Sequence, residues 1–260
     1  MGHIRLGILL GSQKWRQVVA GLRLGSDVEE IAALAAEAAE TSLQAASNDP
    51  VFLHAFWLLT QVPLAARGPA FTEDLSRLGI TVPAHPGLLS VVAAISDAVD
   101  RHARVQGGRT DLGEIAQMAA VESLTATVAP ALPSLFGPEP ADVQHAIGRL
   151  AGGDRFSVLA HEFFARLTQR TFDYFLSREL SNHVGEGNRF RDDSARLQFD
   201  QALSRHCWEA SRIVEDLAGD WYGRNVYRGE GLSPDHVRRF APVAFRKIRD
   251  ALRKRRDAEE

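Results

Sequence analysis

The chain has 260 residues, of which 45% are hydrophobic and 24% charged, and its formal net charge at pH 7 is −3. That length and composition allow one large domain or two small ones with a proper core. The single cysteine, Cys207, excludes an intramolecular disulfide and a cysteine-rich metal site, so a reducing compartment is expected. The apolar run at 50–66 is too short to span a bilayer and no signal peptide is visible, which predicts a soluble cytoplasmic protein.

The first fifteen residues give an ambiguous pattern. Ile4, Leu6, Ile8 and Leu10 alternate as in a short strand, but no second strand pattern occurs to pair with it. We therefore expect an extended arm or a first helical turn.

Helix-start patterns recur through the first half of the chain. Ser26 with Glu29, and Asp111 with Glu114, have the spacing of a capping box, and the Asp-Pro pair at 49–50 combines an N-cap with a proline at the first helical position. Together with the apolar periodicity they predict helices at 26–46, 50–64, 72–78, 88–105, 111–128 and 142–150.

The stretch from Asp154 to His183 contains no glycine and no proline, so it predicts one long helix. Asp154 is the expected N-cap, and Gly185 is expected to end the helix. Apolar residues cover more than half of its circumference, so several neighbouring helices must pack on it. The main stripe is Phe156, Ala160, Phe163, Leu167, Thr171 and Tyr174.

After the long helix we expect a polar loop at 185–193 and a helix at 193–218. The aromatic stretch at 220–231 is expected to be irregular, and a last helix begins at 234, with a kink or restart at Pro242. The chain is thus predicted to be all-α, with eight or nine helices arranged around the long one and no significant sheet. The expected lobes are 1–152 and 153–260, or one continuous domain.

Motifs for metal or cofactor chemistry are incomplete in this sequence. His161-Glu162 begins like a zinc-protease motif, but Ala165 stands where the second histidine belongs. Glu179 and His183 share a helix face without the repeated Glu-x-x-His of carboxylate-bridged metal sites. We predict no metal and no cofactor.

Arg178 and His183 are separated by four residues at the end of the long helix. That spacing resembles the motif of the all-helical HEPN ribonucleases, in which an arginine precedes a histidine by four to six residues. The resemblance covers this short motif alone. It implies that the pair would polarise a scissile phosphate and help transfer a proton.

The C-terminal helix is strongly basic. Between 238 and 257 nine basic residues stand against two acidic ones, whereas the whole chain carries −3. Charge separated in this way favours an acidic partner, either a protein or a nucleic acid; the alternative is that the arginines pair with the acidic surface of the chain's own body. The basic residues are Arg238, Arg239, Arg246, Lys247, Arg249, Arg253, Lys254, Arg255 and Arg256.

The segment at 220–227 is too aromatic for an ordinary solvent loop. Its residues are expected to be buried against the long helix, or else Trp221, Tyr222 and Arg224 form an interface hot spot or a stacking platform for bases.

In general character the chain resembles helical proteins of bacterial multi-gene operons, including phage-defence operons. We therefore expect a non-enzymatic accessory or scaffold subunit that binds a partner through the basic helix and the Trp221 region. A nucleic-acid-binding protein or a HEPN-like ribonuclease is the alternative.

Overall fold

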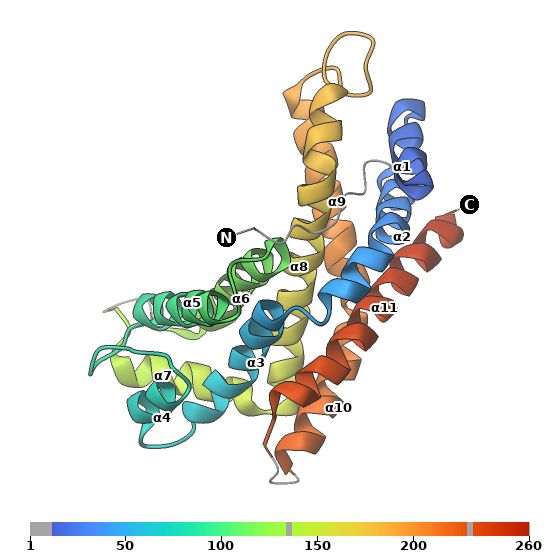
Figure 1. Ribbon diagram of the computed structural model, residues 1–260. Helices are drawn as coiled ribbons and strands as arrows, with labels where there is room; N and C mark the ends of the chain where they lie inside the picture. Colours follow the sequence, from blue (N-terminus) through green and yellow to red (C-terminus); the bar gives the residue numbers. More distant parts are fainter. Residues whose placement is uncertain (1–11, 134–136, 228–230, 260) are drawn as a thin grey trace.

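The computed structural model describes residues 12–133, 137–227 and 231–259, and these fold into helices without any strand (Figure 1). The all-α prediction is confirmed, although the helices are more numerous than the eight or nine expected. In the described residues no helix is both long and apolar enough to cross a membrane. The α-helices are α1 (Gln13–Leu24), α2 (Val28–Ala46), α3 (Pro50–Ala65), α4 (Phe71–Arg77), α5 (Leu88–Val105), α6 (Asp111–Val128), α7 (Pro140–Gly148), α8 (Gly153–Asn182), α9 (Asp193–Ser211), α10 (Ile213–Tyr227) and α11 (Pro234–Glu259).

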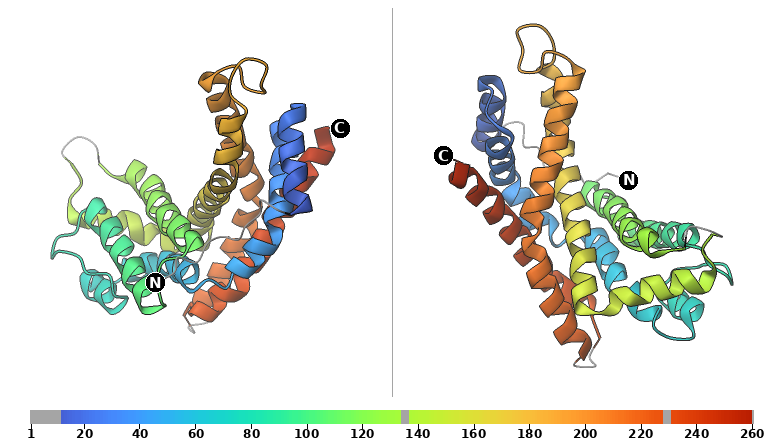
Figure 2. Two further views of the ribbon diagram at one scale, coloured as in Figure 1. Left: turned by 45° about the horizontal axis from the view of Figure 1, so that its top comes forward. Right: turned by 180° about the vertical axis from the view of Figure 1, so that it is seen from behind.

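Helix α8 is the predicted long helix, and it runs through the middle of the molecule (Figures 1 and 2). Its 30 residues extend over about 45 Å. It packs against α6 on one side and against α9 and α10 on the other. The predicted stripe is buried except for Tyr174, which remains 42% exposed and donates a hydrogen bond to Asp111 of α6.

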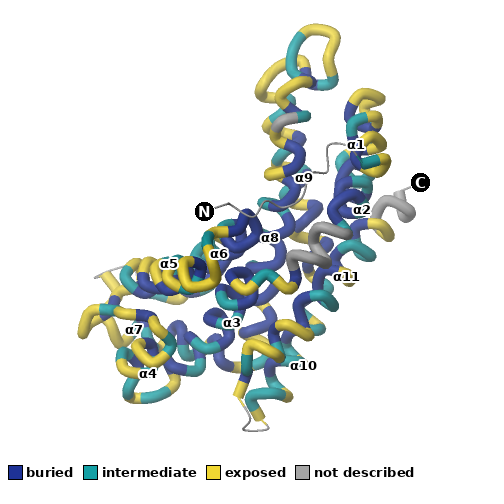
Figure 3. Tube along the Cα trace, viewed as in Figure 1, coloured by how far each residue is buried: buried dark blue, intermediate teal, exposed yellow. Residues whose placement is uncertain are grey.

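The other helices form two groups around α8. Helices α3 to α7 lie together at one end, and α1, α2 and α11 lie side by side along the opposite flank (Figure 2). Buried positions concentrate where α2, α3 and α8 meet, and the loop that follows α8 is the most exposed tip (Figure 3). One buried apolar cluster extends from Trp15 to Leu252 and includes residues on both sides of Gly152.

Three helix starts differ from the expected caps. The side chains that cap α2 and α6 belong to Asp27 and Thr110, one residue away from the expected Ser26 and Asp111. Helix α8 begins after Gly152 without a side-chain cap, so the expected role of Asp154 is wrong. Short polar side chains on neighbouring positions offer similar caps, and the backbone angle at each residue selects between them.

The aromatic stretch after residue 220 was expected to be irregular, and that prediction is wrong. Residues 213–227 form α10, and Arg212 separates this helix from α9, where one helix at 193–218 was expected. Helix α10 lies close to the start of α8, where a Cβ at Gly153 would lie 3.0 Å from the carbonyl oxygen of Gly219. Helix α11, in contrast, continues through Pro242 without a restart.

The loop after α8 is fastened to α1 by one arginine. Nη1 of Arg189 donates to the carbonyl oxygens of Gly21 and Leu22, and Nη2 donates to that of Ser26. The guanidinium carbon also lies 4.9 Å from the ring centroid of Phe199. Arg189 thereby adds a charged donor to carbonyl groups at the C-terminal end of α1, of which that of Gly21 also accepts from the amides of Gly25 and Ser26.

Replacing Arg189 by methionine should lower the free energy of unfolding by about 2 kcal/mol, since the carbonyl groups at the end of α1 lose a charged donor. Urea unfolding followed by circular dichroism measures the change. Arg191→Met is the matched control, because the Arg191 side chain is 92% exposed and should change stability little. Equal stability of the two variants would contradict this role of Arg189.

Candidate partner-binding surface on helix α11

Helix α11 buries one side in the body of the protein. Val237, Ala241, Phe245, Ile248 and Leu252 are all at least nine-tenths buried. They pack the helix against α2, α3, α9 and α10. The basic residues therefore occupy the remaining circumference, and their ion pairs decide what this surface can bind.

Three of the predicted basic residues pair with acidic groups of the chain itself. Arg249 pairs with Glu40 of α2 and, at 2.7 Å, with its neighbour Asp250. Arg253 lies 3.2 Å from Glu37 of α2. Arg238 pairs with Asp235 one turn earlier at 2.6 Å. For these residues the structure supports the alternative of pairing within the chain's own body.

The other cations of α11 have no such partner. Arg239, Arg246, Lys247 and Lys254 are exposed, and none of them forms an ion pair with any residue that the structure describes. The side chains of Arg255 and Arg256 lie outside the described residues. We call Arg239, Arg246, Lys247 and Lys254 the free basic stripe.

The stripe follows the helix on its outward side. Arg239 and Arg246 are seven residues apart, as are Lys247 and Lys254, so each pair spans about two turns and shares a face. From first to last the stripe extends over about 22 Å. Pro242 and Val243, both half-buried, lie between its first two members. The surface therefore combines free positive charge with a small apolar centre.

The Trp221 region is largely part of the core. Tyr222 is fully buried, its ring stacks on Phe156 at 3.9 Å, and its hydroxyl donates to the carbonyl oxygen of Thr60 at 3.2 Å. Burial raises the pKa of Tyr222. Trp221 is half-buried and stacks on Phe240 of α11 with centroids 4.5 Å apart. Of the three predicted contact residues, only Arg224 is exposed, and its Nε donates to the carbonyl oxygen of Asp220.

Trp221→Ala should destabilise the protein by about 2–3 kcal/mol, because it removes the ring that packs α10 on α11. Thermal and urea unfolding measure the loss. Tyr227→Ala in the same helix is the matched control, since Tyr227 is 96% exposed. If the tryptophan variant were as stable as the tyrosine variant, Trp221 would not serve as a packing residue.

The structure describes the side chain of only one residue of the HEPN-like pair. His183 is buried just beyond the end of α8, and its carbonyl oxygen accepts a hydrogen bond from the amide of Phe190. The side chain of Arg178 lies outside the described residues. The proposed ribonuclease pair stays a prediction.

The buried histidine of α8 is held by two other helices. His161 is 2% exposed, its Nε2 lies 2.8 Å from the carbonyl oxygen of Trp208, and its Nδ1 lies 2.7 Å from Glu215. Both ring nitrogens thus face acceptors from α9 and α10.

Cys207 is also fully buried, and burial raises the pKa of its thiol, which opposes nucleophilic use. Among the described residues no three His, Cys, Asp or Glu side chains gather into a metal-binding group.

Sequence reasoning missed a pair of histidines between α3 and α5. The rings of His54 and His102 stack with centroids 4.0 Å apart. Burial lowers the pKa of His54 from 6.5 to about 4, and the charge of His102 adds to this effect. Burial also lowers the pKa of His102, opposed by a hydrogen bond with Pro50 and by Asp49. Their spacing of 48 positions gives no local pattern that could have identified the pair.

The stacked pair predicts a loss of stability in acid. Above pH 6.5 His54 is neutral in both the folded and unfolded states, so it does not make the free energy of unfolding depend on pH there. Between pH 6.5 and about 4 the unfolded chain binds the proton first, and the free energy of unfolding falls by up to ~1.4 kcal/mol per pH unit for this group.

In the His54→Gln variant this contribution to the slope of the free energy of unfolding against pH should vanish. Urea unfolding at several pH values between 7 and 4 measures that slope. Substitution of the exposed His85 by glutamine should leave the slope of the parent protein unchanged. A parent protein and a His54→Gln variant with equal slopes would rule out this origin of acid sensitivity.

Comparison of the chain with family models, with curated proteins and with solved structures finds no match. The free basic stripe is therefore interpreted from its own geometry and charge.

Proposed function

We propose that this protein is a non-catalytic helical subunit of a bacterial multi-protein system and that it binds an acidic protein partner through the free basic stripe of α11. The observation that carries the proposal is the charge of this stripe. Arg239, Arg246, Lys247 and Lys254 are exposed without an ion pair in the described part of the chain. A partner with carboxylates at matching positions would neutralise them.

The docking of α11 makes the stripe suitable for recognition. The helix is fixed to the body through its buried face, so the outward cations are presented on a rigid element. Binding to such a surface costs less ordering of the backbone than binding to a disordered basic tail. Charge complementarity of this kind contributes mainly to the rate of association and to specificity.

The surroundings of the stripe favour a protein over a nucleic acid. Pro242 and Val243 provide an apolar centre beside the cations, as in protein interfaces that combine an apolar core with a polar rim. Asp235 and Asp250 lie on the same helix, with side chains 68% and 43% exposed. These carboxylates pair with Arg238 and Arg249, and a protein partner can place neutral groups opposite such pairs.

The positions of the reactive side chains support a role without catalysis. His161, His206 and Cys207 are all at least nine-tenths buried, and His161 is committed to Trp208 and Glu215. A general base or a nucleophile must come within hydrogen-bonding distance of a substrate, which buried groups of this kind cannot do. Trp221 and Tyr222 are assigned to packing, so the proposed contact area is centred on α11.

Reversing two charges of the stripe tests the proposal. Arg239→Glu combined with Lys247→Glu should reduce recovery of the partner from lysate of the native host by at least about tenfold, because each reversal replaces attraction by repulsion. Quantitative mass spectrometry of affinity-purified protein measures the change. The expected partner presents an acidic surface, and its recovery should fall as salt is raised.

The matched control is Arg104→Glu combined with Arg205→Glu, which alters net charge equally at exposed positions on α5 and α9. This control should recover the partner as the parent does. Gel-shift titrations with RNA and DNA over a salt series complete the test. The proposal fails if both double variants bind equally, or if the stripe variant loses a salt-sensitive nucleic-acid complex instead.

A further inference from the structure

A groove opens between the start of α8 and helix α10, which run side by side (Figure 2). It holds about 670 Å³ of open space. Three glycines, Gly153, Gly219 and Gly223, form part of its lining, and a Cβ at Gly223 would lie in open space. Because glycines carry no side chains, groups of another molecule can approach the backbone of both helices closely.

The groove is acidic. Its charged residues are four carboxylates and one guanidinium group, which belong to Asp154, Glu215, Asp216, Asp220 and Arg224. Glu215 is already paired with His161 at 2.7 Å. Asp154, Asp216 and Asp220 are exposed, and they form no ion pair with any residue that the structure describes. The groove therefore offers three carboxylates that a cationic surface can neutralise. We call it the acidic groove.

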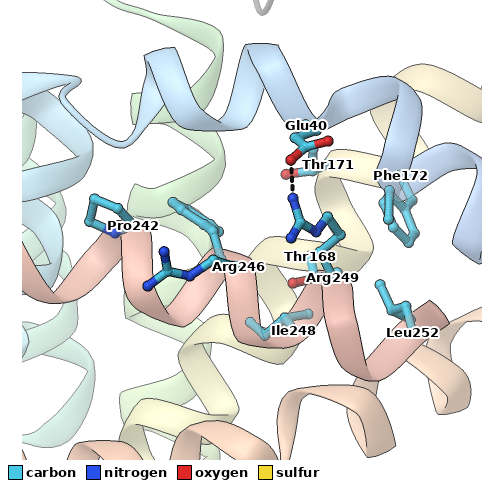
Figure 4. A pocket seen from close by; sticks show the side chains of 11 residues that line it. Glu40, Thr168, Thr171, Phe172, Pro242, Arg246, Ile248, Arg249 and Leu252 are labelled. Carbon is cyan, nitrogen blue, oxygen red and sulfur yellow. Dashed lines mark hydrogen bonds and ion pairs between the residues drawn. The ribbon is translucent and has the colours of Figure 1, made fainter. Parts of the chain in front are cut away.

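The same chain carries the complementary charge on α11. Figure 4 shows Arg249 joined to Glu40 of α2, whereas Arg246 on the same helix is joined to none of the side chains drawn. Arg246 is one of the four cations of the free basic stripe. Within the described part of the chain no ion pair joins this stripe to the acidic groove. Two surfaces of opposite charge are thus present on one molecule without neutralising each other.

We infer that the free basic stripe of one copy binds the acidic groove of a second copy, so that the chain associates head to tail. The inference rests on the proposed function, since it names a second copy of the chain as the acidic partner of the stripe. The long side chains of lysine and arginine enter the groove, where carboxylates of α8 and of α10 pair with them. In such a contact each copy uses two different surfaces, so one chain supplies both halves of the interface.

The chemistry of the two surfaces favours a second copy over other occupants. Unpaired carboxylates in the groove repel the phosphates of a nucleic acid. An unrelated protein bound at one surface would leave the charge of the other surface unmatched, whereas a second copy matches both. Opposite charges on these exposed surfaces attract each other over about 8 Å at physiological ionic strength. The contact is therefore expected to be electrostatic and sensitive to salt.

Sedimentation velocity of the full chain over a concentration series measures the association. We expect a dissociation constant on the order of 10 µM at about 50 mM salt, since exposed charges contribute modestly to affinity. At about 500 mM salt the association should be at least tenfold weaker, because the charges are then screened from each other.

Neutralising the groove locates one side of the contact. The groove variant replaces three carboxylates by amides of the same shape, through Asp154→Asn, Asp216→Asn and Asp220→Asn. It should weaken self-association at least about tenfold, because the cations of the second copy lose their counter-ions. The matched control should associate as the parent does, since it removes the same charge at exposed positions elsewhere, through Glu73→Gln, Asp97→Asn and Glu186→Gln.

Mixing two variants distinguishes a lost contact from a misfolded protein. The stripe variant, Arg239→Glu with Lys247→Glu, should also fail to associate by itself. It keeps the acidic groove, however, and the groove variant keeps the free basic stripe. An equimolar mixture should therefore form a complex of one molecule of each, with about the affinity of the parent, because one contact of the expected kind is intact between them.

The inference is overturned if the parent remains monomeric at about 200 µM and low salt, far above the expected dissociation constant. Equal association of the groove variant and its control, or a mixture of the two variants without a complex, would also overturn it. In each of these cases the stripe can still recover a different acidic protein from the lysate, so the proposed function fails only by its own test.

Discussion

The fold depends on burying the apolar surface of α8. Phe156, Phe163, Phe164 and Phe172 are each at most 1% exposed, although they point to different sides of one helix. No single neighbouring helix can cover such a surface, so helices from both halves of the chain must reach it. Helices α3 and α6 come from before it in sequence, and α9, α10 and α11 come from after it. This requirement explains why the buried cluster continues across the glycine pair at 152–153.

The same requirement determines how α11 presents its charge. Burial of Phe245 and Ile248 against the core fixes the rotation of the helix, and this rotation directs the arginines away from the aromatic rings. Helix α2 lies alongside and offers Glu37 and Glu40, which pair with Arg253 and Arg249 of α11. Among the other α11 cations with described side chains, Arg238 pairs with Asp235, and Arg239, Arg246, Lys247 and Lys254 have no ion pair with the described residues. The free basic stripe thus follows from two facts, namely the orientation of α11 and the small number of acidic groups beside it.

The sequence was most informative where periodicity was long and uninterrupted. It predicted α5 to the residue and α8 to within one residue, because continuous apolar patterns without breakers define helices well. It failed at α10, because the aromatic stretch at 220–231 was expected to be irregular. Gly219 lies against Gly153 at the start of α8, a tertiary contact that no local pattern contains. The cap positions differed by one residue for a similar reason, since backbone angles rather than residue types decide them.

The candidate sites were only partly accessible from the sequence. The sequence identified a basic helix but could not separate Arg249, which Glu40 neutralises, from Arg246, which has no such partner in the described residues. These two side chains lie three residues apart and differ only in which element they face. A residue's function in this protein therefore depends less on its type than on which neighbours the burial of α8 brings to it.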